Sequence, residues 1–357
     1  MKKQPFISIA IGCSMAFTAA SPIPAPRENQ TSRDLQHLKQ LKKTDRIDRA
    51  IQNGLEFLVR QQVADQGYFR GKYRNAYTAL ACLALMAAGE QDGRSEYGTQ
   101  LRRGIIYLVE QTKEKGPYLG TDGSRMYGHA IATVALCEAY GMLANHADNQ
   151  AIKNAIQRLT PVIIDAQVDA NTQNQGGWRY EPDGADADLS VTAWQILALR
   201  ALENCGFEVP QKTIDAALKY VRSLYTDGQG FSYMKGRQPT PAMLAAGIVS
   251  VTALADDTDP INSEMIQTTA AQLLKITDAT TGKHYYYQAY YLAIAANMLG
   301  DDYGKSLVPR IQKALLKLQQ DNGEFAQVTG YDGGVYSTSL AILSLAVRYQ
   351  WLPIYQK

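Results

Sequence analysis

The sequence predicts an all-α fold in which about six helical hairpins form an inner and an outer ring of helices. Three observations lead to this prediction. An amphipathic segment recurs at intervals of about 50 residues, a glycine-containing turn with an aromatic residue follows most copies, and a segment of small and apolar residues follows each turn. A repeat of this kind cannot bury its own apolar face, so the copies are expected to close as a set.

The amphipathic segments supply the outer helices. In the first, Ile47, Ile51, Leu55 and Leu58 are spaced three or four positions apart, the pattern of a helix with one buried face. Further copies begin at Leu101, Ile152, Ile214 and Ile311. The turns that follow contain Gly67-Tyr68-Phe69, Gly176-Gly177-Trp178, Gly228-Gln229-Gly230-Phe231 and Gly323-Glu324-Phe325.

The segments after the turns supply the inner helices. They are apolar on nearly every side, so they must be covered on nearly every side. They span residues 77–88, 127–140, 189–202, 243–254, 286–299 and 335–347.

Composition excludes several classes of protein. The chain has 357 residues, 46% of them hydrophobic, and 36 basic against 34 acidic side chains give a net charge of +2. This balance is unlike that of a nucleic-acid-binding protein, so we expect no nucleic-acid partner. The hydrophobic content excludes a disordered chain. After residue 20, no apolar stretch is long enough for a transmembrane helix.

The N-terminus resembles an export signal. Lys2 and Lys3 precede an apolar stretch, and Thr18-Ala19-Ala20 offers a small-residue cleavage site, so we predict a signal peptide over 1–20. A Pro-rich, polar tether is expected over 21–45, and a single domain over 46–357. The prediction is therefore a periplasmic or secreted protein. A lipoprotein anchored at Cys13 is the less favoured alternative.

The remaining cysteines predict neither a disulfide framework nor a metal site. Cys82, Cys137 and Cys205 lie in apolar helical segments, and their odd number argues against full pairing. No Cys/His spacing fits zinc, so no metal and no cofactor are expected.

The repeat resembles that of a known superfamily. Gln167 with Gly176-Gly177-Trp178 is its best copy, and Gln62, Gln111 and Gln320 mark degenerate ones. An amphipathic helix ending in Gln, followed by Gly-x-aromatic, is similar to the repeat of the terpenoid cyclase/protein prenyltransferase α/α-toroid superfamily. The chain looks closest to exported bacterial proteins with prenyltransferase and squalene oxidase repeats. The resemblance implies an α/α toroid from about Arg46 to the C-terminus, but it hardly implies an activity.

One acidic pair fits the resemblance. Squalene-hopene cyclases carry Asp-x-Asp-Asp-Thr near an inner-helix start, and the middle aspartate protonates an alkene. Mapped by motif, Asp188 would be that acid and Asp186 its neighbour, with Leu189 and Ser190 replacing the last two residues. His129 occupies the matching offset in another inner helix and would assist. The competing interpretations are that Asp188 caps its helix and that His129 is a structural hydrogen-bonding residue.

Aromatic residues on the inner helices are candidates for binding a ligand. The competing interpretation is that they pack in the core with their hydroxyls paired. His284 resembles a zinc ligand of protein prenyltransferases, but the Asp-x-Cys pair that such a site needs is missing upstream. The predicted substrate-binding residues are Tyr127, Trp194, Tyr285, Tyr286, Tyr290 and Tyr336.

Three functions are consistent with these residues. The leading hypothesis is a central cavity that binds an apolar or isoprenoid-like ligand, with cyclase or isomerase chemistry at Asp188. The second is a carbohydrate-active toroid, a lyase or glycosidase, that uses His129 and the tyrosines. The third is a non-catalytic scaffold or partner-binding module, which a ring centre filled by large side chains would favour.

Overall fold

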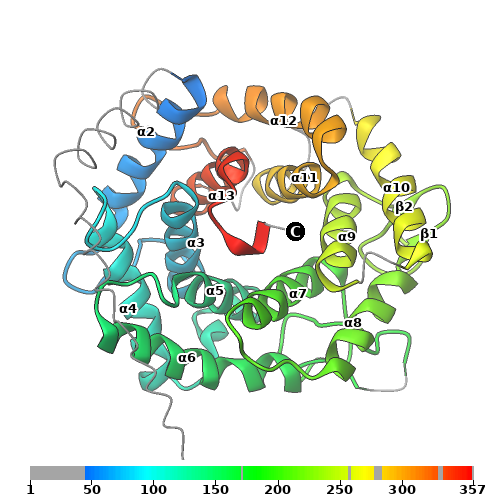
Figure 1. The fold of residues 1–357 in the computed structure, drawn as a ribbon, viewed down its shortest axis with the longest axis horizontal. Coiled ribbons are helices and arrows are strands. Elements are labelled where there is room, and N and C mark those ends of the chain that lie inside the picture. Colours follow the sequence, from blue (N-terminus) through cyan, green and yellow to red (C-terminus); the bar gives the residue numbers. More distant parts are fainter. Residues whose placement is uncertain (1–44, 170–171, 256–258, 277–283, 329–332, 356–357) are drawn as a thin grey trace, which may run out of the picture. The chain divides into compact units, whose positions relative to one another are not determined.

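The computed structural model describes residues 45–169, 172–255, 259–276, 284–328 and 333–355. Arg46–Lys357 folds as one compact unit of two concentric helical rings (Figure 1). The inner ring consists of α3 (Arg74–Ala87), α5 (Arg125–Ala139), α7 (Leu189–Asn204), α9 (Pro241–Leu254), α11 (Tyr285–Leu299) and α13 (Val335–Ala346). The outer ring consists of α2 (Arg46–Gln61), α4 (Gly98–Glu114), α6 (His146–Asp165), α8 (Gln211–Ser223), α10 (Pro260–Leu274) and α12 (Asp301–Leu316).

Short elements fill the connections. They are the 3₁₀ turns η1 (Leu119–Asp122), η2 (Val347–Tyr349) and η3 (Pro353–Tyr355), and the antiparallel strands β1 (Tyr225–Thr226) and β2 (Gly230–Phe231). Each inner helix packs on the next, and α13 packs on α3, so the inner ring is closed. The all-α double ring predicted from the repeat is confirmed. The amphipathic pattern located five of the six outer helices. It did not locate α10, because few of the buried residues of that helix are large and apolar.

The repeated glutamine ties neighbouring hairpins together. The side-chain amide of Gln62 donates to the carbonyl of Gly67 in its own turn and to that of Gln100 in the next outer helix, both at 2.8 Å. Gln167 bonds in the same way to Gly176 and to Thr213 of α8, both at 2.9 Å. The motif therefore fixes the spacing of successive outer helices.

The last copy closes the outer ring. Gln319, rather than the adjacent Gln320, donates to Gly323 at 3.3 Å and to Ala50 of α2 at 2.7 Å. Gln111 makes no such bridge and instead bonds to Glu114 on its own helix. The repeat glycines are needed because the turn lies against the next helix. At Gly176, with φ of +91°, a Cβ would lie 2.1 Å from the Ala216 carbonyl oxygen.

In three of the four turns, the aromatic residue connects the turn to the inner helix that follows. Phe69, Trp178 and Phe325 are fully buried. Their backbone N–H groups donate at 3.0–3.1 Å to the hydroxyls of Thr78, Thr192 and Thr338. Turn, inner helix and next outer helix are thus fixed by one local pattern.

The two ends of the ring differ. The N-terminal ends of the inner helices gather at one end, called the mouth here, where Tyr127 of α5 and Tyr287 of α11 both bond to Ser190 of α7. At the other end, residues Leu352–Tyr355, the C-terminal strap, turn into the ring centre (Figure 1).

Cys82, Cys137 and Cys205 are free thiols, the first two buried and the third half-buried. Across the described ranges, no helix has both the length and the apolar character needed to cross a bilayer. The predicted signal peptide with Cys13, and the tether up to residue 44, lie outside the described residues.

Candidate functional site

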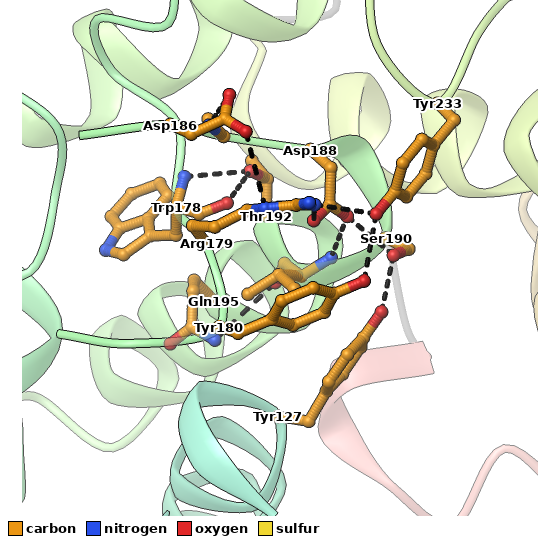
Figure 2. A network of polar contacts seen from close by, with 12 residues as sticks. Tyr127, Trp178, Arg179, Tyr180, Asp186, Asp188, Ser190, Thr192, Gln195 and Tyr233 are labelled. Carbon is orange, nitrogen blue, oxygen red and sulfur yellow. Dashed lines mark hydrogen bonds and ion pairs between the residues drawn. The ribbon is translucent and has the colours of Figure 1, made fainter. Parts of the chain in front are cut away.

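Asp188 is the centre of a polar cluster at the mouth (Figure 2). It is the N-cap of α7, and its Oδ1 accepts the Val191 N–H at 3.0 Å and the Ser190 hydroxyl at 2.6 Å. Its Oδ2 forms an ion pair with Arg179, and its side chain is fully buried. Every partner is a donor, so the carboxyl group acts here as an acceptor only.

Arg179 holds both predicted acidic residues. One guanidinium nitrogen, Nη1, binds Asp188 and also donates to the Tyr233 hydroxyl at 2.6 Å. Its Nε lies 3.5 Å from Asp186 Oδ2. The guanidinium is 4.3 Å from the Tyr180 ring centre, a cation–π distance, and its side chain is 24% exposed. Arg179 therefore joins the buried and the solvent-facing parts of the cluster.

Three tyrosines complete the cluster. The Tyr180 and Tyr233 hydroxyls are 2.9 Å apart. Because Ser190 uses its one hydrogen on Asp188, the Tyr127 hydroxyl donates to Ser190. Burial, and secondarily the charge of Asp188, raises the pKa of Tyr127 and of Tyr233, so both phenols stay protonated at neutral pH.

Asp186 reaches solvent. Its side chain is 47% exposed, and it accepts the N–H of Ala187 at 2.8 Å while it faces Arg179. Farther out on the rim, Arg125 and Glu181 pair at 2.9 Å with about half of each side chain exposed.

His129 faces a different part of the molecule. Its Nδ1 accepts the Leu119 N–H and its Nε2 lies against the Leu159 carbonyl of outer helix α6, both at 3.3 Å. The ring is fully buried, and burial lowers the pKa of His129 to about 4. His129 is therefore neutral and bonded to backbone, and the structure does not bring it to the Asp188 cluster.

Below the mouth, an aromatic layer fills the ring centre. Trp194 of α7 stacks on Tyr290 of α11 with ring centres 5.2 Å apart and an 8° angle between the planes. Tyr291 meets Trp194 edge-on at 6.0 Å, and Tyr287 connects this layer to the mouth through a 4.7 Å ring contact with Tyr291. All four rings are buried. Two residues predicted to bind substrate thus lie in contact with one another in the core.

The other predicted aromatic residues are dispersed. Tyr285 and Tyr286 are buried, with ring centres 5.0 Å apart, and the Tyr286 hydroxyl donates to the Ala326 carbonyl. Tyr336 is half-buried and its ring lies 5.9 Å from that of Tyr77. These three side chains do not join the Asp188 cluster in any interaction found among the described residues.

Several residues of the cluster were not predicted. Arg179 and Tyr180 follow the best copy of the turn, yet only their position beside Asp188 in space reveals a role. Tyr233 follows the Gly230-Phe231 turn by two residues, but nothing in that motif indicates that its hydroxyl reaches Arg179. Within the described ranges, no group of three His, Cys, Asp or Glu side chains could hold a metal ion.

Comparisons with known proteins agree with the fold. The family model for the prenyltransferase alpha-alpha toroid domain matches residues 183–350. The chain therefore has the α/α-toroid fold that this family model describes. No curated protein sequence matches this toroid.

Solved toroids of two kinds are similar in structure. One is an inactive variant of the α-1,6-mannanase of Salegentibacter sp. HEL1_6, in complex with α-1,6-mannotriose. It superposes with a TM-score of 0.62 and 13% sequence identity, and the match covers 84% of this chain and 98% of the mannanase. The type II terpene cyclase MstE from Scytonema has a TM-score of 0.55 at 14% identity over 86% of this chain and 99% of the cyclase. At such identities the likeness shows the fold alone.

Proposed function

We propose that this toroid is a glycan-binding protein whose site is the partly exposed tyrosine–arginine cluster at the mouth, and that it does not cleave its ligand. The observation that carries the proposal is the arrangement of Arg179, Tyr180 and Tyr233 on a rigid frame beside Asp186. Planar, amphipathic side chains with fixed polar tips suit the alternating apolar and hydroxyl faces of a sugar.

The geometry argues against hydrolysis by the acidic pair. Glycosidases need two carboxyl groups that flank the scissile bond, one of them able to donate a proton. Here Asp188 is fully buried and both carboxylates face the same guanidinium. The fold accommodates α-1,6-mannotriose in the mannanase and a geranylgeranyl dihydroxybenzoate in the terpene cyclase, so the residues of this chain must decide the ligand.

Calorimetry with α-1,6-mannotriose and a panel of plant and bacterial oligosaccharides tests the proposal. We expect binding to at least one glycan, and at least tenfold weaker binding in Tyr180→Ala. Lys113→Ala removes a more exposed side chain on outer helix α4, which pairs with Glu110 rather than with the cluster, and should bind as the wild type does. The absence of a binding signal with every oligosaccharide of the panel would refute glycan binding. Release of reducing sugar ends would refute the claim that the protein does not cleave its ligand.

A second candidate function rests on the aromatic layer. Trp194, Tyr290 and Tyr291 form the kind of lining that stabilises an apolar ligand or a developing cation. An isoprenoid held there would support the hypothesis of an apolar ligand. For Asp188 to be the acid of that hypothesis, it would have to leave its ion pair with Arg179 and take up a proton. Native mass spectrometry of the purified protein, followed by lipid extraction, tests it: a co-purifying lipid that is lost in Trp194→Ala supports this candidate, and a clean apoprotein contradicts it.

A further inference from the structure

The C-terminal strap occupies a position that a ligand could take. Ile354 and Tyr355 are buried against the inner ring, and η3 packs on α7 and α11. The Tyr355 ring lies 6.4 Å from that of Tyr290, so it continues the aromatic layer toward the far end of the ring. Figure 1 shows this segment turned into the ring centre rather than across its edge.

Three polar side chains of the inner helices form hydrogen bonds with the backbone and the phenol of the strap. The Ile354 N–H donates to Glu138 Oε1 at 3.3 Å, and the Asn297 side-chain amide donates to the Tyr355 carbonyl at 3.2 Å. The Tyr355 hydroxyl donates to the Tyr290 hydroxyl at 3.3 Å. One N–H, one C=O and one phenol are thus recognised, which is the chemistry of a short peptide that carries a tyrosine.

The strap leaves this site incompletely satisfied. All three hydrogen bonds are longer than the usual 2.9–3.0 Å. The second oxygen of Glu138, whose side chain is almost fully buried, has no hydrogen-bond partner. At the start of the segment, Gln350 adopts φ of +52°, a left-handed conformation that is unfavourable for a residue other than glycine. The strap is thus held mainly by the burial of Leu352, Ile354 and Tyr355, with long hydrogen bonds and a strained hinge. A segment held in this way can be exchanged for a second copy of the same apolar side chains.

We propose that the far end of the ring is a peptide-binding site, that the chain's own strap occupies it in cis, and that release of the strap exposes the aromatic layer. The ligand class is a short peptide with an apolar residue followed by tyrosine. This inference does not depend on glycan binding at the mouth, because the two sites lie at opposite ends of the inner helices.

The test is complementation in trans. A chain that ends at Gln350 is mixed with a labelled peptide of the sequence Trp351–Tyr355, and binding is followed by fluorescence anisotropy. We expect the shortened chain to bind the peptide, and to bind the Tyr355→Ala peptide at least tenfold more weakly. The full chain should bind at least tenfold more weakly than the shortened one, since its own strap competes at high effective concentration. A folded shortened chain that ignores the peptide, or equal binding by both chains, would overturn the proposal.

Hydrogen exchange on the full chain gives a second test if the shortened chain does not fold. The Ile354 amide should exchange at least tenfold faster than the Leu197 amide in the middle of α7, because the strap opens while the ring stays folded. Equal rates, limited by global unfolding, would show that the strap is a permanent part of the core and would overturn the proposal.

Discussion

Asp188 serves two purposes that substitution can separate. As N-cap it needs only a side-chain acceptor, which asparagine also provides. As partner of Arg179 it needs a charge. Asp188→Asn should therefore keep the cap but leave a half-buried guanidinium without its main counter-charge, at a cost of about 2–4 kcal/mol in the free energy of unfolding.

Urea unfolding of Asp188→Asn measures that cost, with Asp186→Asn as the matched control. Asp186 is half-exposed and lies farther from Arg179, so its substitution should change stability by less than about 0.5 kcal/mol. Equal effects of the two substitutions would contradict the structural role assigned to Asp188.

His129 should impose an acid limit on stability. Because its folded-state pKa of about 4 lies below the ordinary 6.5, the unfolded chain binds more protons between these values. Stability is therefore complete above pH 6.5 and falls as pH decreases toward 4, by up to about 1.4 kcal/mol per pH unit. Urea unfolding of the wild type and of His129→Gln measures this over the same pH range. The stability of His129→Gln should depend less on pH than that of the wild type, and parallel pH profiles would show that the His129 imidazole titrates normally.

At the scale of elements, most helices of the double ring could be predicted because the apolar residues that bury them recur periodically in the sequence. Inner helices that are buried on all sides, such as α9 and α11, consist almost entirely of small, apolar or aromatic residues, and this composition is apparent from the sequence alone. By contrast, α10 buries Thr269, Ala270 and Leu273, a pattern too weak to mark an outer helix. Gln319 and Gln320 are indistinguishable in the sequence, and only the direction of the side chain decides which one bridges.

The candidate site was predictable only in part. Asp188 could be placed because an inner helix begins after it. Arg179 and Tyr233 reach it from two separate loops, and a contact between loops leaves no periodic trace in a sequence. Glu138 gave no signal, since a single acidic residue at the end of an apolar helix is usually solvated. The strap places it in the core.

The turn between hairpins offers a test at this scale. Gly176 and Gly228 both have positive φ, but a Cβ on Gly176 would meet the Ala216 carbonyl at 2.1 Å while a Cβ on Gly228 meets nothing within 4 Å. Gly176→Ala should destabilise the protein by more than about 3 kcal/mol, because it adds a steric clash to the backbone strain, whereas Gly228→Ala should cost about 1 kcal/mol from strain alone. Thermal and urea unfolding of the two variants measure the difference. Similar losses would mean that the turn does not pack on the next helix as described.

At the scale of the whole molecule, side chains from both ends of the ring meet along its axis. Tyr127 at the mouth contacts Ser190, the aromatic layer follows, and the strap reaches Glu138 at the far end. A filled axis is consistent with the proposed role as a binding protein that does not cleave its ligand. It also means that a ligand can enter the centre from the far end only if the strap moves.

Glu138 should make stability depend on pH through this strap. Burial raises the pKa of Glu138 to about 8, the hydrogen bond from the Ile354 N–H opposes the rise, and the nearby Cys205 adds to it. Burial raises the pKa of each of its other titratable neighbours, Tyr290, Tyr355 and Cys137, so these three groups stay neutral across this range. The hydrogen bond with Cys137 lowers the pKa of Cys205, so a Cys205→Ser background removes that group from the measurement. Between pH 4.5 and 8 the folded chain therefore holds a proton that the unfolded chain has lost, so stability falls as pH rises through this window.

Replacing Glu138 by glutamine should remove that fall, because an amide keeps an acceptor for Ile354 without an ionisable proton. We expect the wild type to lose more stability than Glu138→Gln between pH 5 and 8 in urea unfolding, by up to about 1.4 kcal/mol per pH unit. Exchange of the Ile354 amide should accelerate with pH more steeply in the wild type than in the variant, once intrinsic exchange is corrected. If the variant shows the wild-type profile in both measurements, Glu138 is ionised in the folded chain at neutral pH and does not couple the strap to proton binding.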